Sequence, residues 1–353
     1  MSAPPRVPGA EAFGWPELAP TPRDVVMRDG TATLLRFRGE AAGRSVVAAP
    51  LLLVPSLINR WYVLDLRRGS SLAEAAVRGG LDTFCLDWGV PEDEDRYLGW
   101  DDVLARLARA VRRVRRITGA ACVSLLGYCM GGTLSAIHAA LEPEGVAALV
   151  DLAGPIDFAH AGLLGTLTDA RWFDARAIVE GGNVRAAQMQ GGFVALRPTS
   201  AMAKALGLLE RGHDPAAREA FLALETWAAD NVPFPAAAYV TYIEELYQQN
   251  RLVAGTHFVA GRRVDVGAIR APTLVVVADR DAICPPEAAF GLARAREGRA
   301  PPTRVLTVPG GHVGAVVGSR AARVLYPAIV EWLSSAPRTL AATAAAASEV
   351  PVS

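Results

Sequence analysis

The sequence feature that most restricts the fold is the segment LLGYCMGGTLSA, residues 125–136. It joins an apolar run to a helix-forming stretch through Gly127, Gly131 and Gly132. Glycines at these positions let a strand and a helix pack closely on either side of a sharp turn. The residue inside such a turn is held in a strained conformation and projects its side chain into a cleft. Here that residue is Cys129, at a position where serine is the usual nucleophile.

Strand and helix signals alternate on both sides of this turn. Apolar runs typical of strands buried on both faces occur at 46–56, 81–89, 121–127, 145–155, 271–281 and 303–312. Helices are predicted between them at 70–80, 99–119, 131–143, 286–297 and 320–334. Residues 31–39 alternate as an outer antiparallel strand does. The pattern predicts an α/β fold with a mostly parallel sheet flanked by helices.

The alternation stops in the middle of the chain. Residues 156–255 carry helical stretches and aromatic clusters but no buried-strand run, so we expect a helical cap inserted into one core. That core comprises residues 25–155 and 256–335. Proline-rich residues 1–24 are predicted to form an extension, and low-complexity residues 336–353 a disordered tail.

Composition restricts the class of protein further. The 353 residues carry a formal net charge of zero and are 51% hydrophobic, which argues against nucleic acid as the main partner. The four cysteines show no CxxC spacing, and the first residues lack the pattern of a signal peptide. Without a long apolar run, a membrane span is not expected. We therefore expect a cytoplasmic protein with free thiols, in which Cys122 and Cys85 are buried structural residues.

Two further segments supply partners for Cys129. Asp281 follows the apolar run of VVVADRDAICPP and fits a catalytic acid better than Asp279, which we interpret as a loop cap. His312 follows the last predicted strand on the glycine-rich loop VPGGHVGAVVG. The order nucleophile, acid, histidine is that of the α/β-hydrolase fold. We predict that His312 takes the proton of the Cys129 thiol and that Asp281 orients the imidazole.

An anion-stabilising site is expected beside this triad. The backbone N–H of Met130 is one predicted donor, and the segment PSLINR supplies another near Leu57 or Ile58. The start of the helix after Cys129 also favours a thiolate there. We expect no metal and no cofactor.

With these residues identified, the chain resembles the polyhydroxyalkanoate synthases, which have the α/β-hydrolase fold. GYCMGGT matches their Gly-x-Cys-x-Gly-Gly box, and VPSLINRWYVLDL is similar to their segment after the first buried strand. LDWGVPEDEDRYLGWDD, GGHVGAVVG and WAADNVPFPAAAYVTYIEELYQQNRL resemble further family segments. The resemblance extends over about residues 25–335.

The resemblance implies a reaction and roles for several residues. Cys129 would carry the growing polyester as a thioester, His312 would activate it, and Asp281 would help to activate the hydroxyl of the incoming 3-hydroxyacyl-CoA. It implies substrate contacts by Asn59 and Tyr128. A thiolate suits this chemistry, because passing an acyl group from one thioester to another is nearly neutral in energy.

The sequence departs from the family in two ways. Ala282 stands where family members usually have a histidine after the catalytic aspartate. Only about 45 residues precede the first buried strand, which points to the short, class III-like type. That type implies a second synthase subunit, a homodimer when active, and a place on polyester granules. The basic run VRRVRRITG, residues 111–119, could meet the phosphates of coenzyme A but fits a solvated helix face better.

Two other functions remain open at this stage. A cysteine-dependent acyltransferase, thioesterase or depolymerase would use the same three residues and differ in the group that receives the acyl chain. A non-catalytic granule-binding protein is the less favoured alternative, because such a protein has no need of the complete Cys129, Asp281 and His312 set. The aromatic residues of the cap fit an apolar tunnel and ordinary packing equally well.

Overall fold

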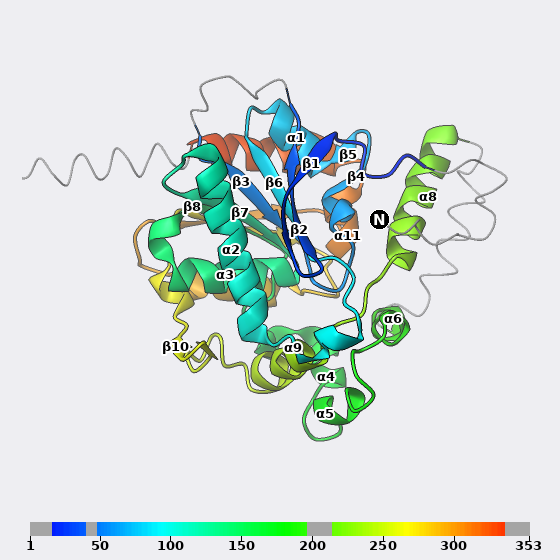
Figure 1. Cartoon of the computed structure of the whole chain (residues 1–353), viewed down its shortest axis with the longest axis vertical. Coiled ribbons are helices and arrows are strands. Elements are labelled where there is room, and N and C mark those ends of the chain that lie inside the picture. Colours follow the sequence, from blue (N-terminus) through cyan, green and yellow to red (C-terminus); the bar gives the residue numbers. More distant parts are fainter. Residues whose placement is uncertain (1–15, 40–47, 196–213, 336–353) are drawn as a thin grey trace, which may run out of the picture.

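The computed structural model describes residues 16–39, 48–195 and 214–335, and they contain a central eight-stranded sheet (Figure 1). The strand order is β1-β2-β6-β3-β7-β8-β11-β12. The strands are β1 (Arg23–Asp29), β2 (Ala32–Phe37), β3 (Leu51–Val54), β6 (Thr83–Asp87), β7 (Val123–Tyr128), β8 (Val146–Leu152), β11 (Thr273–Ala278) and β12 (Thr303–Val308).

In this order the six strands β6, β3, β7, β8, β11 and β12 are parallel to one another. At one side of the sheet, β2 pairs antiparallel with both β6 and β1. Strands β3, β7, β8 and β11 are buried at every residue, as their continuous apolar runs predict. The predicted α/β class and mostly parallel sheet are confirmed. Because the parallel strands all point the same way, the loops after β3, β7, β11 and β12 converge at the carboxyl ends of the strands.

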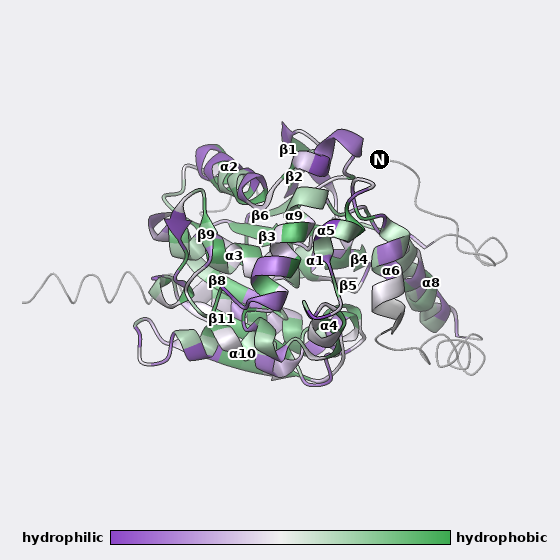
Figure 2. Ribbon diagram, turned by 90° about the horizontal axis from the view of Figure 1, so that it is seen from below, coloured by the Kyte–Doolittle hydropathy of each residue, from purple (hydrophilic) through white to green (hydrophobic). Residues whose placement is uncertain are grey.

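Helices cover both faces of the sheet. One face packs against α2 (Trp100–Thr118), α3 (Met130–Leu141) and α10 (Pro286–Ala295), and the other against α1 (Leu72–Arg78), α11 (His312–Val317) and the helical residues 321–335. In Figure 2 the strands are mostly hydrophobic, while hydrophilic residues gather on the outer surfaces of helices such as α2. This distribution of hydrophobic and hydrophilic residues is typical of a sheet covered by a layer of helices on each face.

The predicted helix ends have local causes. Ser71 caps α1 by accepting a hydrogen bond from the N–H of Glu74 at 2.8 Å. At the start of α2, Asp102 accepts from the N–H of Gly99 at 2.9 Å, and α2 ends at Gly119, whose φ of 71° suits glycine.

The segment between β8 and β11 is mostly helical. Its elements are α4 (Gly162–Leu167), α5 (Ala175–Ile178), α6 (Ala186–Ala195), α8 (Pro215–Ala229), α9 (Ala236–Thr241), the π-helical η6 (Tyr242–Gln248) and the hairpin of β9 (Phe258–Val259) and β10 (Arg262–Arg263). Figure 1 shows α4, α5, α6 and α9 gathered beyond one edge of the sheet, while α8 lies beside it. We call residues 156–255 the cap.

Some expectations differ from the structure. The strand expected over 46–56 spans only 51–54 among the described residues, and β1 and α11 were not predicted. Strand β1 alternates poorly because it lies at the sheet edge with a bulge between Val25 and Met27. Cys85 is buried as expected, but Cys122 is partly exposed because it precedes β7 instead of lying within it. Residues 1–15 and the predicted disordered tail, 336–353, lie outside the described residues. None of the described helices is long and apolar enough to cross a membrane.

Candidate active site

Cys129 occupies the turn between β7 and α3. Its φ of 58° and ψ of −129° place a non-glycine residue in a strained region, where its N–H donates to the carbonyl oxygen of Leu152 at 3.0 Å. A Cβ at Gly131 would overlap the carbonyl oxygen of Val54, and one at Gly127 would overlap the backbone of Gly131. The glycine pattern is thus required by close packing of strand and helix around Cys129.

His312 and Asp281 meet at the carboxyl ends of the parallel strands, where Cys129 also lies. Nδ1 of His312, at the start of α11, lies 2.6 Å from Oδ2 of Asp281, on the loop after β11. The other carboxylate oxygen of Asp281 accepts from the N–H groups of Ile283 at 2.8 Å and Cys284 at 2.9 Å. Both side chains of the pair are buried. These bonds fix the carboxylate, and the carboxylate in turn fixes the orientation of the imidazole.

The second ring nitrogen of His312, Nε2, is buried and lacks an ordinary hydrogen-bond partner among the described residues. Burial alone would lower the pKa of His312. The negative charges of Cys129 and Asp281, together with hydrogen bonding, outweigh burial and raise the pKa to about 10. The imidazole is therefore placed to hold a proton beside the Cys129 sulfur and the Asp281 carboxylate.

Tyr128 supports this imidazole. Its ring stacks on His312 with a centroid distance of 5.1 Å and an interplanar angle of 27°. Its hydroxyl donates to the carbonyl oxygen of His312 at 3.4 Å. Substrate contact by Tyr128 stays a prediction, but the structure gives the residue a second task, because its stacking fixes the plane of the imidazole.

The cavity at Cys129 has a volume of about 220 Å³. Core and cap both contribute to its wall, which is mostly apolar. The lining includes Ile58, Met130, Ile283 and Cys284 from the core and Leu164, Phe173, Ile178, Met189, Phe234, Tyr239, Tyr242 and Tyr247 from the cap. An apolar enclosure of this kind suits an acyl chain better than a charged group.

The predicted anion-stabilising residues separate into two groups. Ile58 and Met130 both line the cavity beside Cys129, whereas Leu57 lines a different small pocket next to Trp88. Met130 is the first residue of α3, so its N–H has no partner within the helix. Its place in the cavity wall favours Ile58 over Leu57 as the second donor residue. In this structure the N–H of Ile58 donates to Oγ of Ser56 at 3.5 Å, and its role as an anion donor stays a prediction.

Asn59 lies at the boundary between core and cap. Its Nδ2 donates to Oδ1 of Asn231 at 2.5 Å, and the two residues form an isolated antiparallel bridge. Asn231 in turn donates to Gln190 of α6. Asn59 thus joins the loop after β3 to the cap, and its predicted substrate contact remains untested.

Several cavity residues were not singled out from the sequence, and Tyr242, Tyr247 and Cys284 are three of them. Tyr242 and Tyr247 lie with their rings 5.3 Å apart, and burial raises the pKa of both phenols. Burial also raises the pKa of the Cys284 thiol well above its usual range, which keeps that residue protonated beside the nucleophile position. The aromatic segment FPAAAYVTYIEELYQQ, residues 234–249, was the available signal for the two tyrosines, but spacing alone does not tell which of its rings face a cavity.

The elbow after β7, the acid after β11 and the histidine after β12 of a parallel sheet define an α/β hydrolase fold. Residues 49–318 match the family described as alpha/beta hydrolase fold. Among solved structures, a monoglyceride lipase of Saccharomyces cerevisiae is similar with a TM-score of 0.57 at 13% identity, covering 91% of this chain and 99% of that one. A hydrolase from Pseudomonas aeruginosa gives 0.54 at 18% identity, covering 88% and 98%. These two likenesses show the fold alone.

The sequence comparisons are more specific. Residues 11–76 match the family described as the poly-beta-hydroxybutyrate polymerase (PhaC) N-terminus. The poly(3-hydroxyalkanoate) polymerase subunit PhaC of Haloferax mediterranei is 32% identical, covering 94% of this chain and 67% of that one. The subunits PhaC of Allochromatium vinosum and Synechocystis are 30% and 31% identical, each covering 89% of this chain, and 88% and 84% of their own lengths. The chain belongs to the PhaC family of poly(3-hydroxyalkanoate) polymerase subunits.

Proposed function

We propose that this protein polymerises 3-hydroxyacyl-CoA into polyester and releases coenzyme A, with Cys129 as the acyl carrier. The observation that carries the proposal is that Cys129 lines an apolar cavity and acts on His312, which is paired with Asp281. Membership of the PhaC family supports it, because the named relatives are poly(3-hydroxyalkanoate) polymerase subunits.

The first half of the reaction loads the enzyme. The Cys129 sulfur attacks the thioester carbonyl, and His312 holds the proton that the thiol loses. The oxyanion that forms accepts hydrogen bonds from the N–H groups proposed at Met130 and Ile58. When the carbon–sulfur bond to coenzyme A breaks, the leaving thiolate takes the proton from His312. The acyl group remains on Cys129 as a thioester.

The second half extends the chain. The hydroxyl of a second 3-hydroxyacyl-CoA gives its proton to the His312–Asp281 pair and attacks the thioester on Cys129. An ester bond forms, and the bond to the Cys129 sulfur breaks. Hydrolysis competes with this step, and the apolar cavity wall disfavours it by excluding water. No cofactor enters the scheme, because the thioester substrate is already activated.

We further propose that the active enzyme is a homodimer that works with a second synthase subunit in the cytoplasm, at the surface of polyester granules. Exposed apolar side chains on the cap support contact with an apolar surface. They are Leu163 and Leu167 of α4, Trp172, and Ile178 of α5, which are between 37% and 58% exposed.

The test is incubation of the purified protein and Cys129→Ala with 3-hydroxybutyryl-CoA, following free coenzyme A with a thiol reagent. Release that requires Cys129 and yields insoluble polyester is expected. Monomeric hydroxy acid as the product would make the protein a thioesterase. Equal release by both proteins would overturn the role of Cys129. The assay is run with and without a class III partner subunit, and absence of release in both cases counts against the proposal.

A further inference from the structure

A second pocket, lined by three arginines, lies on the far side of the loop that follows β3. Its volume is about 660 Å³, and its wall includes Arg23, Arg28 and Arg60. Of the described residues that form this wall, Asp87 is the one that is acidic. We call it the arginine pocket. Its positive charge contrasts with the apolar cavity at Cys129.

The arginine pocket extends along β1, from Arg23, which pairs with Phe37 near the start of β6, to Arg28. Strand register places its Arg28 end at the carboxyl ends of the parallel strands, where Cys129 lies. Arg28 pairs with Thr33, and Thr33 pairs with Asp87, so the three form one row across β1, β2 and β6. Asp87 ends β6, which runs parallel to β3 and β7. Adjacent strands are about 4.8 Å apart, so the four spacings from β1 to β7 give roughly 20 Å. This is the scale of the extended pantetheine arm between the thioester of coenzyme A and its phosphates.

Arg60 connects the two sites. It follows Ile58 by two residues, so their Cα atoms are at most about 7 Å apart, and Ile58 lines the cavity at Cys129. The Arg60 side chain is 6% exposed, and its Nε has no hydrogen-bond partner among the described residues. Its nearest carboxylate, Asp230, is 3.5 Å away and accepts a hydrogen bond from Tyr62. The charges of Arg60 and Arg23 also act on Asp87, where they oppose the rise that burial causes in the pKa of that carboxyl. Among the described residues, the pocket wall thus holds three guanidinium groups and one carboxyl group, which favours a further anion.

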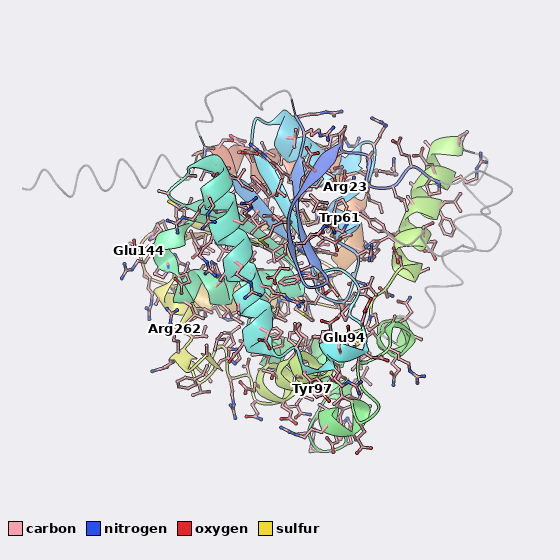
Figure 3. All side chains as sticks on the ribbon, viewed as in Figure 1. Arg23, Trp61, Glu94, Tyr97, Glu144 and Arg262 are labelled. Atoms are coloured by element: carbon pink, nitrogen blue, oxygen red, sulfur yellow. The ribbon has the colours of Figure 1, made fainter. Side chains whose placement is uncertain are left out.

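Arg23 is held in place by the protein. One of its terminal nitrogens donates to the carbonyl oxygens of Ala19 and Thr21, at 2.7 and 3.1 Å. Its guanidinium lies 4.7 Å from the ring centroid of Trp61, and Figure 3 shows the two side chains together beside the edge strands. Fixing the guanidinium before a ligand arrives lowers the entropy cost of binding. Arg28 is exposed and completes the pocket.

The other candidate for a phosphate site lies at the wrong end of the molecule. The arginines of 111–119 are near the end of α2, just before β7 begins. Cys129 follows the opposite end of β7, so the strand's length separates this basic run from the cysteine. Among the described residues, the lining of the apolar cavity includes no positive side chain.

We propose that the arginine pocket binds the phosphate groups of the coenzyme A thioester while its acyl end enters the cavity at Cys129. This inference rests on the proposed function. Arginine suits the task because its guanidinium forms paired, charge-assisted hydrogen bonds with phosphate oxygens.

The test compares Arg28→Glu with wild type on 3-hydroxybutyryl-CoA and on 3-hydroxybutyryl-pantetheine, which lacks the phosphates. The KM for the coenzyme A thioester is expected to rise about tenfold, or about 1.4 kcal/mol, with the KM for the pantetheine thioester unchanged. Arg270→Glu is the matched control, because Arg270 is an exposed arginine paired with Glu144. Figure 3 shows Glu144 far from Arg23 and Trp61. Circular dichroism confirms that each variant is folded.

Calorimetry with coenzyme A alone separates this inference from the proposed function. Binding by the wild type and about tenfold weaker binding by Arg28→Glu support the pocket even if neither thioester is turned over. Equal Kd values for the two proteins overturn the assignment, as does an equal rise of KM for both thioesters. The same loss of affinity in Arg270→Glu would show a net-charge effect and also overturn it.

Discussion

Asp281 holds His312 through a 2.6 Å contact between Oδ2 and Nδ1, and two backbone N–H groups hold the other oxygen of the same carboxylate. The acid is therefore fixed independently of the histidine. With Nδ1 engaged, only Nε2 remains to exchange a proton with Cys129. The contact between Asp281 and Nδ1 therefore fixes the roles of the three groups: Asp281 orients the imidazole, and Nε2 accepts the proton of the Cys129 thiol.

Asp281→Asn is expected to lower kcat by about 10³–10⁴-fold, because an amide does not stabilise the charged imidazole and favours the wrong tautomer. Free coenzyme A release measures the change. Asp279→Asn is the matched control, since that neighbouring side chain is partly exposed and bonds to the N–H of Gly310 instead. Comparable losses in both variants would contradict the role assigned to Asp281.

The pKa of His312 is expected to fall in Cys129→Ala. In the wild type, the charges of Cys129 and Asp281 outweigh burial and raise this pKa to about 10. Removing one negative charge destabilises the imidazolium, so the proton leaves at lower pH. Titration of the His312 ring protons by NMR measures the shift. An unchanged or higher pKa in the variant would show that the thiolate does not act on the imidazole.

Gly131→Ala is expected to destabilise the fold by about 3 kcal/mol, because its Cβ would overlap the backbone of β3. Gly314→Ala in α11 is the matched control, since no atom lies within 4 Å of the added Cβ. That change should be neutral or stabilising by up to about 1 kcal/mol. Urea unfolding measures both, and equal stability of the two variants would contradict the packing argument.

Phe173→Ala is expected to shift substrate preference toward longer 3-hydroxyacyl chains, because it removes a ring from the cavity wall. Each further buried methylene contributes about 0.8 kcal/mol, so the ratio of kcat/KM between chain lengths should change by several-fold. Trp172→Ala provides the comparison, as the adjacent side chain is 58% exposed. If both variants keep the wild-type ratio, the cavity does not hold the acyl chain.

Much of this arrangement was already determined by the sequence. The apolar runs buried on both faces predict parallel strands, and the glycines around Cys129 predict close packing of a strand and a helix on either side of a sharp turn. The positions of Asp281 and His312 after late strands follow from the same alternation. Such features depend on local patterns of hydrophobicity and backbone freedom, which the chain displays without its tertiary structure.

Tertiary structure alone decided which side chains surround these groups. The stacking of Tyr128 on His312, the closeness of Cys284 to Cys129 and the separation of Leu57 from Ile58 depend on how loops and cap pack together. The row of Arg28, Thr33 and Asp87 depends on strand register, which pairs residues far apart in the chain. Contacts of this kind arise from long-range packing, and local sequence patterns carry no record of them.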